Sequence, residues 1–131
     1  MKNVMEMNHV LVVEDDKEIR EGVEIYLKSQ GYEVFQAADG VEGLEVIEKE
    51  DIHLAIVDIM MPRMTGCEAA KAIRALPGRP DAAKIPIIAM TANAFAEDVQ
   101  ASLAAGMDAH LSKPFVIQNV LETISRLLAQ T

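Results

Sequence analysis

Three consecutive carboxylates follow an apolar run near the start of the chain. The stretch is HVLVVEDDKE, in which the run spans residues 9–13 and the acids are Glu14, Asp15 and Asp16. Two like charges about 4 Å apart repel by about 1 kcal/mol in water and by about 4 kcal/mol at an effective dielectric of 20. A bound cation would offset that repulsion, whereas acids in a solvated loop that caps the next helix would need none. Both interpretations fit these residues taken alone.

Three further polar side chains stand at the ends of later apolar runs. Asp58 ends the run LAIVD, Thr91 follows IPIIAM, and Lys113 follows AHLS. If these runs are parallel strands, their carboxyl ends meet at one edge of the sheet, where open α/β sheets bind ligands. Clustered carboxylates suit a hard cation such as Mg²⁺. An ionised Asp58 could then act as a nucleophile toward a phosphoryl group, whose oxygens Lys113 and Thr91 would stabilise.

The elements that would position these residues alternate along the chain. Apolar runs typical of buried strands are followed five times by segments with helical periodicity. This alternation predicts an α/β fold with a five-stranded parallel sheet, doubly wound, and helices on both faces. We expect strands at 9–13, 32–37, 54–58, 85–90 and 109–112, and helices at 17–30, 40–50, 67–76, 95–106 and 116–128.

Helical periodicity also predicts which side chains face the sheet. Gly31 and Gly106 stand where the first and fourth helices should end. The inner positions expected, in chain order, are Ile19, Val23, Tyr26, Leu27, Val41, Leu44, Ile47, Ala69, Ala72, Ile73, Leu76, Phe95, Val99, Leu103, Val116, Val120, Ile124, Leu127 and Leu128.

Composition argues against several classes of protein. The chain has 131 residues, enough for one domain, and no apolar run approaches the roughly 20 residues that span a bilayer. Its net charge of −9 disfavours direct binding to nucleic acid or to an anionic membrane. The N-terminal segment lacks the pattern of a secretory signal, and the single cysteine, Cys67, precludes an internal disulfide. We therefore expect a cytoplasmic protein in which Cys67 is structural.

Four motifs together resemble the receiver domain of two-component signalling proteins. They are VLVVEDD, VDIMMPRMTG, AMTANA and SKPF, in this order, and the resemblance covers residues 8–129. It implies a CheY-like, flavodoxin-like (βα)5 fold, which is a three-layer sandwich. It also implies a single receiver domain over residues 1–131, with its core at about 8–129 and flexible residues 1–7. Such a domain regulates signalling and is not an enzyme in the usual sense, although it assists its own phosphorylation and dephosphorylation.

The resemblance assigns the acids to distinct roles. Asp58 matches the aspartate that accepts the phosphoryl group. Asp15 matches the acid that binds the metal directly, and Glu14 matches the neighbour that holds a metal-bound water. The backbone carbonyl of Met60 matches a further ligand, and the metal is Mg²⁺, with Mn²⁺ as a substitute. Asp16 has no such counterpart, and its place before a helix predicts an N-cap.

The resemblance also assigns the residues around the phosphoryl group. Thr91 and Lys113 match the hydroxyl and the ammonium that hold its oxygens, and a cis peptide bond is implied before Pro114. Met60 and Asn93 match positions that tune the lifetime of the phosphorylated state. We expect slow loss of the group, because the Met60 side chain cannot guide a water by hydrogen bonding.

His110 departs from the family pattern, in which many receivers carry an aromatic residue three positions before the lysine. A rotamer switch that couples Thr91 to His110 and an ordinary, partly buried strand histidine are equally consistent with the sequence. In the first case, phosphorylation would remodel the face formed by residues 95–106, the last strand and the last helix.

The expected partners follow from the same resemblance. A histidine kinase or a histidine phosphotransfer domain would donate the phosphoryl group, and a fused or separate effector would read it. A dimer that depends on phosphorylation is a further expectation. The first half of the chain resembles receivers fused to DNA-binding effectors, and the second half resembles receivers of hybrid histidine kinases. The last helix runs almost to Thr131, so we expect no effector domain within this chain.

Other functions meet specific objections. A flavodoxin-like cofactor binder needs a phosphate-binding loop after the first strand, where the acids of EDDKE would repel a phosphate. A dinucleotide enzyme needs G-x-G-x-x-G, which the chain lacks. A phosphatase with an aspartyl nucleophile typically has a second acid two residues later, where Met60 stands. A degenerate receiver that acts only as an interaction module remains the alternative.

Overall fold

The expected parallel sheet is present in the computed structural model, which describes residues 8–58, 66–76, 82, 84–91, 103–112 and 117–129. All neighbouring strands pair in parallel, in the spatial order β2-β1-β3-β4-β5. The strands are β1 (His9–Val13), β2 (Glu33–Ala37), β3 (Leu54–Asp58), β4 (Ile87–Thr91) and β5 (Ala109–Ser112). The helices are α1 (Lys17–Ser29), α2 (Gly40–Lys49), α3 (Gly66–Arg74) and α5 (Ile117–Ala129). The predicted doubly wound α/β fold is confirmed.

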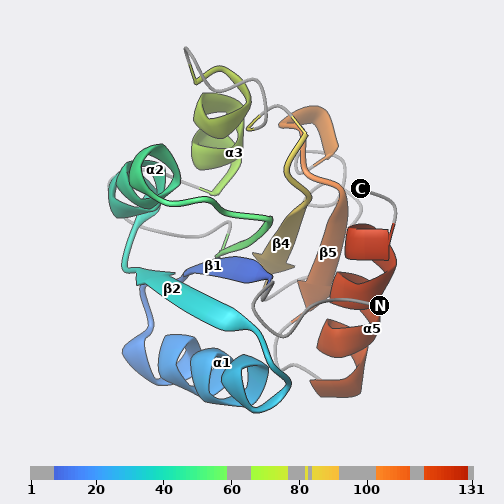
Figure 1. Ribbon diagram of the computed structural model, residues 1–131. Helices are drawn as coiled ribbons and strands as arrows, with labels where there is room; N and C mark the ends of the chain where they lie inside the picture. Colours follow the sequence, from blue (N-terminus) through green and yellow to red (C-terminus); the bar gives the residue numbers. More distant parts are fainter. Residues whose placement is uncertain are drawn as a thin grey trace.

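The helices cover the sheet from two sides (Figure 1), with α1 and α5 on one face and α2 and α3 on the other. Strand alternation sorts the core side chains between these faces. Val10 and Val12 pack with the α1 and α5 side chains, whereas Leu11 and Val13 pack with those of α2 and α3. Both faces of the central strands are thus buried, which explains their continuous apolar runs. No helix within the described part of the chain is long and apolar enough to cross a membrane.

Two predicted inner positions are wrong. In α3 the buried residues are Gly66, Ala69, Ala70 and Ile73, so Ala70 and not Ala72 is fully covered. The buried residues are spaced at i, i+3, i+4 and i+7 from Gly66, and Ala72 lies beside this stripe, where it is half-buried. Leu103, expected to face inward, is 57% exposed. The helix expected over 95–106 otherwise lies mostly outside the described residues, as do Phe95, Val99 and Val116.

A network of hydrogen bonds centred on Arg74 holds the amino-terminal ends of β4 and β5. Arg74 donates from Nε to the Gly106 carbonyl at 3.0 Å and from Nη2 to Asp108 Oδ2 at 2.9 Å. The same Asp108 oxygen accepts the Ile87 backbone N–H at 2.8 Å. Arg74 therefore ties α3 to the segments that enter β4 and β5, and this sets the position from which both strands run toward their carboxyl ends.

Helix α1 ends at a glycine, as predicted. Gly31 has a φ of 92°, and its N–H donates to the Lys28 carbonyl at 3.1 Å. The Tyr32 N–H donates to the Leu27 carbonyl at 3.2 Å. These two bonds form a Schellman motif, in which the residue with positive φ satisfies the last carbonyls of the helix. Gly106 also has a positive φ, 96°, which agrees with its predicted role as a helix end.

Two glycines near α1 predict opposite effects of the same substitution. Nothing lies within 4 Å of a Cβ built on Gly22, inside the helix, or on Gly31, after it. Gly22→Ala should raise the free energy of unfolding by about 0.5–1 kcal/mol, because alanine loses less backbone entropy in a helix. Gly31→Ala should lower it by about 1 kcal/mol, because a Cβ strains a residue at positive φ. Urea unfolding of both variants measures the difference, and equal signs would contradict this assignment.

Candidate functional site

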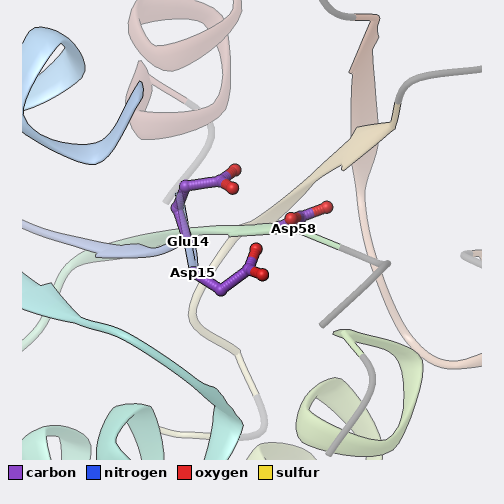
Figure 2. A group of neighbouring side chains, drawn as sticks. All are labelled: Glu14, Asp15 and Asp58. Carbon is purple, nitrogen blue, oxygen red and sulfur yellow. The ribbon is translucent and has the colours of Figure 1, made fainter. Parts of the chain in front are cut away.

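Glu14, Asp15 and Asp58 meet at the carboxyl ends of β1 and β3. Val13 pairs with Val57 in the parallel register, so the two strands end beside each other. Asp58 is the last residue of β3, and Glu14 and Asp15 directly follow β1. The three carboxylates converge beyond these strand ends (Figure 2), and each contributes one oxygen to a group whose members all lie within 4.8 Å of one another. The predicted acidic cluster is therefore confirmed for these three residues.

Burial strengthens the electrostatic repulsion between these carboxylates. Glu14 is 0% exposed and Asp58 is 2% exposed, whereas Asp15 is exposed to solvent. Like charges repel more strongly as the effective dielectric falls, so two buried acids beside a third cannot rely on water alone. Hydrogen bonds supply part of the compensation: Glu14 Oε1 accepts the Asp16 backbone N–H at 3.1 Å. A cation between the carboxylates would offset the remaining repulsion.

The donor set fits Mg²⁺. All three side chains offer carboxylate oxygens, which this ion prefers, and two oxygens bound to one Mg²⁺ lie at most about 4.2 Å apart because each Mg–O distance is about 2.1 Å. The observed grouping within 4.8 Å needs only a small contraction to reach that geometry. The exposed Asp15 also leaves one side open to water, and Mg²⁺ usually keeps several waters.

Asp16 has a separate role, as predicted. Its Oδ1 accepts the backbone N–H groups of Glu18 at 3.0 Å and of Ile19 at 3.2 Å. It is the N-cap of α1, with extended backbone angles of φ −75° and ψ 113°. The cap satisfies two otherwise unpaired donors of the first turn and places a negative charge at the positive end of the helix. Asp16 thus directs its carboxylate to α1.

An arginine that the sequence did not single out contacts this loop. Arg20 Nη1 donates to the backbone carbonyl of Glu14 at 2.7 Å, and its Nε donates to Gln36 Oε1 at 3.0 Å. The only local signal is a basic residue four positions after the N-cap. The contact with Gln36 on β2 spans 16 residues of sequence and depends on the packing of α1 against the sheet.

The other predicted site residues are described in part. Thr91 ends β4 and pairs with Ser112 of β5, while its neighbour Met90 pairs with Asp58. The backbone of Thr91 therefore reaches the same edge of the sheet as the acidic cluster. Lys113, Met60, Asn93 and Pro114 lie outside the described residues, so their roles stay predictions.

His110 lies on β5, where its register partner is Ala89. It is exposed, so the interpretation of His110 as an ordinary, partly buried strand histidine is wrong. Its neighbour Leu111 is buried on the α5 side, so strand alternation turns His110 to the other face, and β5 is an edge strand. The rotamer switch stays a prediction.

The N-cap assignment predicts how substitutions at position 16 behave. Asp16→Ala should lower the free energy of unfolding by about 1 kcal/mol, because Glu18 and Ile19 lose their acceptor. Asp16→Asn is the matched control: it removes the charge but keeps a capping oxygen, so stability should stay close to wild type. Urea unfolding measures stability, and Mn²⁺ titration followed by electron paramagnetic resonance measures cation binding. A large loss of Mn²⁺ affinity in Asp16→Asn would show that Asp16 belongs to the cation site.

Comparisons with known proteins agree with this geometry. Residues 10–125 match the family model described as response regulator receiver domain. The chain is 37% identical over 122 residues to response regulator MprA of Mycobacterium tuberculosis (strain ATCC 25618 / H37Rv), and 35% identical over 122 residues to MprA of Mycobacterium leprae. Each alignment covers 93% of this chain and 51% of the relative, so the chain spans about half the length of the curated relatives it matches.

Solved structures give the same family. Chemotaxis protein CheY4 of Vibrio cholerae is 37% identical, with a TM-score of 0.87 over 93% of this chain and 99% of that one. The receiver domain of sensor histidine kinase PA1611 from Pseudomonas aeruginosa PAO1 is 31% identical, with a TM-score of 0.86 over 95% of this chain and 99% of that one. The PA1611 structure has a magnesium ion coordinated in the active site cleft.

Proposed function

Because the chain belongs to the response regulator receiver domain family, which signals through phosphorylation, we propose that Asp58 is its phosphoacceptor. The observation that supports this most directly is the acidic cluster. Asp58 lies at the end of a fully buried strand, with oxygens of Glu14 and Asp15 in the same group within 4.8 Å. An ionised carboxylate at the open end of a strand can act as a nucleophile toward phosphorus.

The proposed reaction transfers a phosphoryl group from a phosphohistidine. An oxygen of Asp58 forms a bond to phosphorus while the bond between phosphorus and the histidine nitrogen breaks, and the donor leaves with that electron pair. The Thr91 hydroxyl and the Lys113 ammonium would donate hydrogen bonds to the phosphoryl oxygens. Transfer of this kind needs positioning and charge stabilisation more than covalent participation by other residues.

Mg²⁺ is the proposed cofactor, with Mn²⁺ as a substitute. Asp15 and Asp58 would bind it directly, Glu14 would hold one of its waters, and the Met60 carbonyl would complete the protein ligands. When bound, the ion supplies positive charge that compensates the three carboxylates and the incoming phosphoryl oxygens. The chain's own part is to hold the ligands at the end of a rigid sheet and to keep Glu14 and Asp58 out of bulk water.

The proposed partners are a histidine kinase or a histidine phosphotransfer domain as donor, and an effector that reads the phosphorylated state. The exposed side chain of His110 on β5 and the outer side of α5 belong to the face that we propose changes on phosphorylation. A degenerate receiver that binds a partner without phosphorylation would need no acidic cluster. The presence of all three acids therefore favours a receiver that works through phosphorylation.

Intact mass spectrometry tests the phosphoacceptor. After incubation with acetyl phosphate and Mg²⁺, the mass of the wild-type chain should rise by one phosphoryl group, whereas Asp58→Asn should show no increase. Asp51→Asn is the matched control, because Asp51 is an exposed acid before β3 and should be dispensable. Full labelling of Asp58→Asn would identify another acceptor, and absence of labelling in the wild type would favour the interaction module.

A further inference from the structure

Arg20 joins α1, the acidic loop and β2. Its Nη1 donates to the Glu14 carbonyl at 2.7 Å, its Nε donates to Gln36 Oε1 at 3.0 Å, and its backbone N–H donates to the Asp16 carbonyl at 2.9 Å. The residue is half-buried, so both side-chain bonds are partly shielded from water. Bonds from a guanidinium to neutral acceptors are stronger than those between neutral groups, and the fixed fork of Arg sets their directions.

Gln36 also interacts with a second residue of α1. Its side chain lowers the pKa of the Glu24 carboxyl, while its Oε1 accepts the Arg20 Nε–H. Besides Gln36, the hydrogen bond and charge of Lys28 and the charge of Arg20 also lower the pKa of Glu24, whereas partial burial raises it. Lys28 Nζ lies 3.2 Å from Glu24 Oε2. Arg20, Glu24 and Lys28 are spaced four apart and so line one side of α1, facing β2 through Gln36.

The bond to the Glu14 carbonyl restrains the peptide group that leads to Asp15. That carbonyl oxygen belongs to the planar peptide group that joins Glu14 to Asp15. On the other side of Glu14, its backbone N–H donates to the Ala37 carbonyl of β2 at 3.1 Å. Both backbone polar groups of Glu14 are therefore held against β2, one directly and one through Arg20 and Gln36. Fixing this plane fixes the position of the Asp15 Cα atom, from which the side chain starts.

We propose that Arg20 is a positioning residue for the cation site, which holds the Glu14–Asp15 peptide so that Asp15 presents its carboxylate to Asp58. The proposal rests on the proposed function only in naming a cation as the ligand; the positioning itself is a property of the metal-free chain. The positioning role and the charge of Arg20 predict opposite effects of its removal on cation affinity. Removal of a positive charge beside three acids would strengthen cation binding, whereas loss of the positioning bonds would weaken it.

The test uses three variants of the full chain and one control. Arg20→Met removes the charge and the donors but keeps the length, and Arg20→Lys keeps the charge without the fork. Gln36→Leu leaves Arg20 in place without its support on β2. Arg126→Met removes an exposed positive charge on α5. Mn²⁺ affinity of the unphosphorylated protein is measured by electron paramagnetic resonance, and backbone ¹⁵N order parameters are measured in excess chelator. Far-UV circular dichroism confirms folding.

The expected result is a loss of Mn²⁺ affinity of about 10-fold in Arg20→Met, within the range seen when residues supporting metal ligands are removed. Arg20→Lys and Gln36→Leu should weaken binding in the same direction, and Arg126→Met should not weaken it. In chelator, the backbone order parameter of Asp15 in Arg20→Met and Gln36→Leu should fall well below about 0.85, the value that marks a rigid backbone. If the wild type binds Mn²⁺, tighter or unchanged binding in Arg20→Met overturns the positioning role, and an unchanged order parameter in all variants overturns it in any case.

The two readouts separate this proposal from the proposed function. If the wild-type chain does not bind Mn²⁺ but the order parameter of Asp15 falls in Arg20→Met and Gln36→Leu, the cation site fails and the positioning of the loop stands. If the wild type binds Mn²⁺ and none of the Arg20 and Gln36 variants changes affinity or order, the cation site stands and the role of Arg20 fails.

Discussion

Mutual repulsion among three carboxylates is the constraint around which this end of the molecule is organised. Glu14, Asp15 and Asp58 offer oxygens within 4.8 Å of one another, and two of the three side chains are almost completely buried. A protein retains such an arrangement only when other charges and hydrogen bonds offset its cost. Within the described part of the chain, the Asp16 N–H and the Arg20 guanidinium are among the groups that offset this cost, and the proposed Mg²⁺ would add to them. The same repulsion would favour binding of a cation between these carboxylates.

The sheet is what prevents the acids from moving apart. Both faces of β1 and β3 are covered, so the side chains before the acids are locked in two aliphatic cores of high packing density. The register that pairs Val13 with Val57 then leaves no freedom in where the strands end. Two hydrogen bonds further limit relief of the repulsion by loop movement: the Glu14 N–H donates to the Ala37 carbonyl, and Arg20 donates to the Glu14 carbonyl. The packed cores thus hold the strand ends, and with them the three carboxylates, in place despite the repulsion between the carboxylates.

Sequence alone predicted the alternation of strands and helices along the chain and the ends of all five strands to within two residues. It also predicted the N-cap role of Asp16 and the grouping of Glu14, Asp15 and Asp58. These succeed because apolar periodicity, helix caps and the carboxyl ends of parallel strands follow local rules. Three features did not follow from local rules. The choice of Ala70 over Ala72 on the inner face of α3 depends on how the helix packs against its neighbours, and the exposure of His110 depends on the edge position of β5. The contacts of Arg20 depend on how α1 packs against β2.

Urea unfolding of wild type and Asp15→Asn, each in excess Mg²⁺ and in excess chelator, tests the central claim most directly. Asp15 is exposed, so replacing its carboxylate by an amide changes charge without opening a cavity. If repulsion governs the cluster, Asp15→Asn is the more stable protein in chelator, by at least about 1 kcal/mol, the repulsion of one like-charge pair about 4 Å apart in water. Mg²⁺ then stabilises the wild type strongly and the variant little, so that the order reverses. A variant that is less stable than wild type in chelator, or that gains as much from Mg²⁺, would contradict the account.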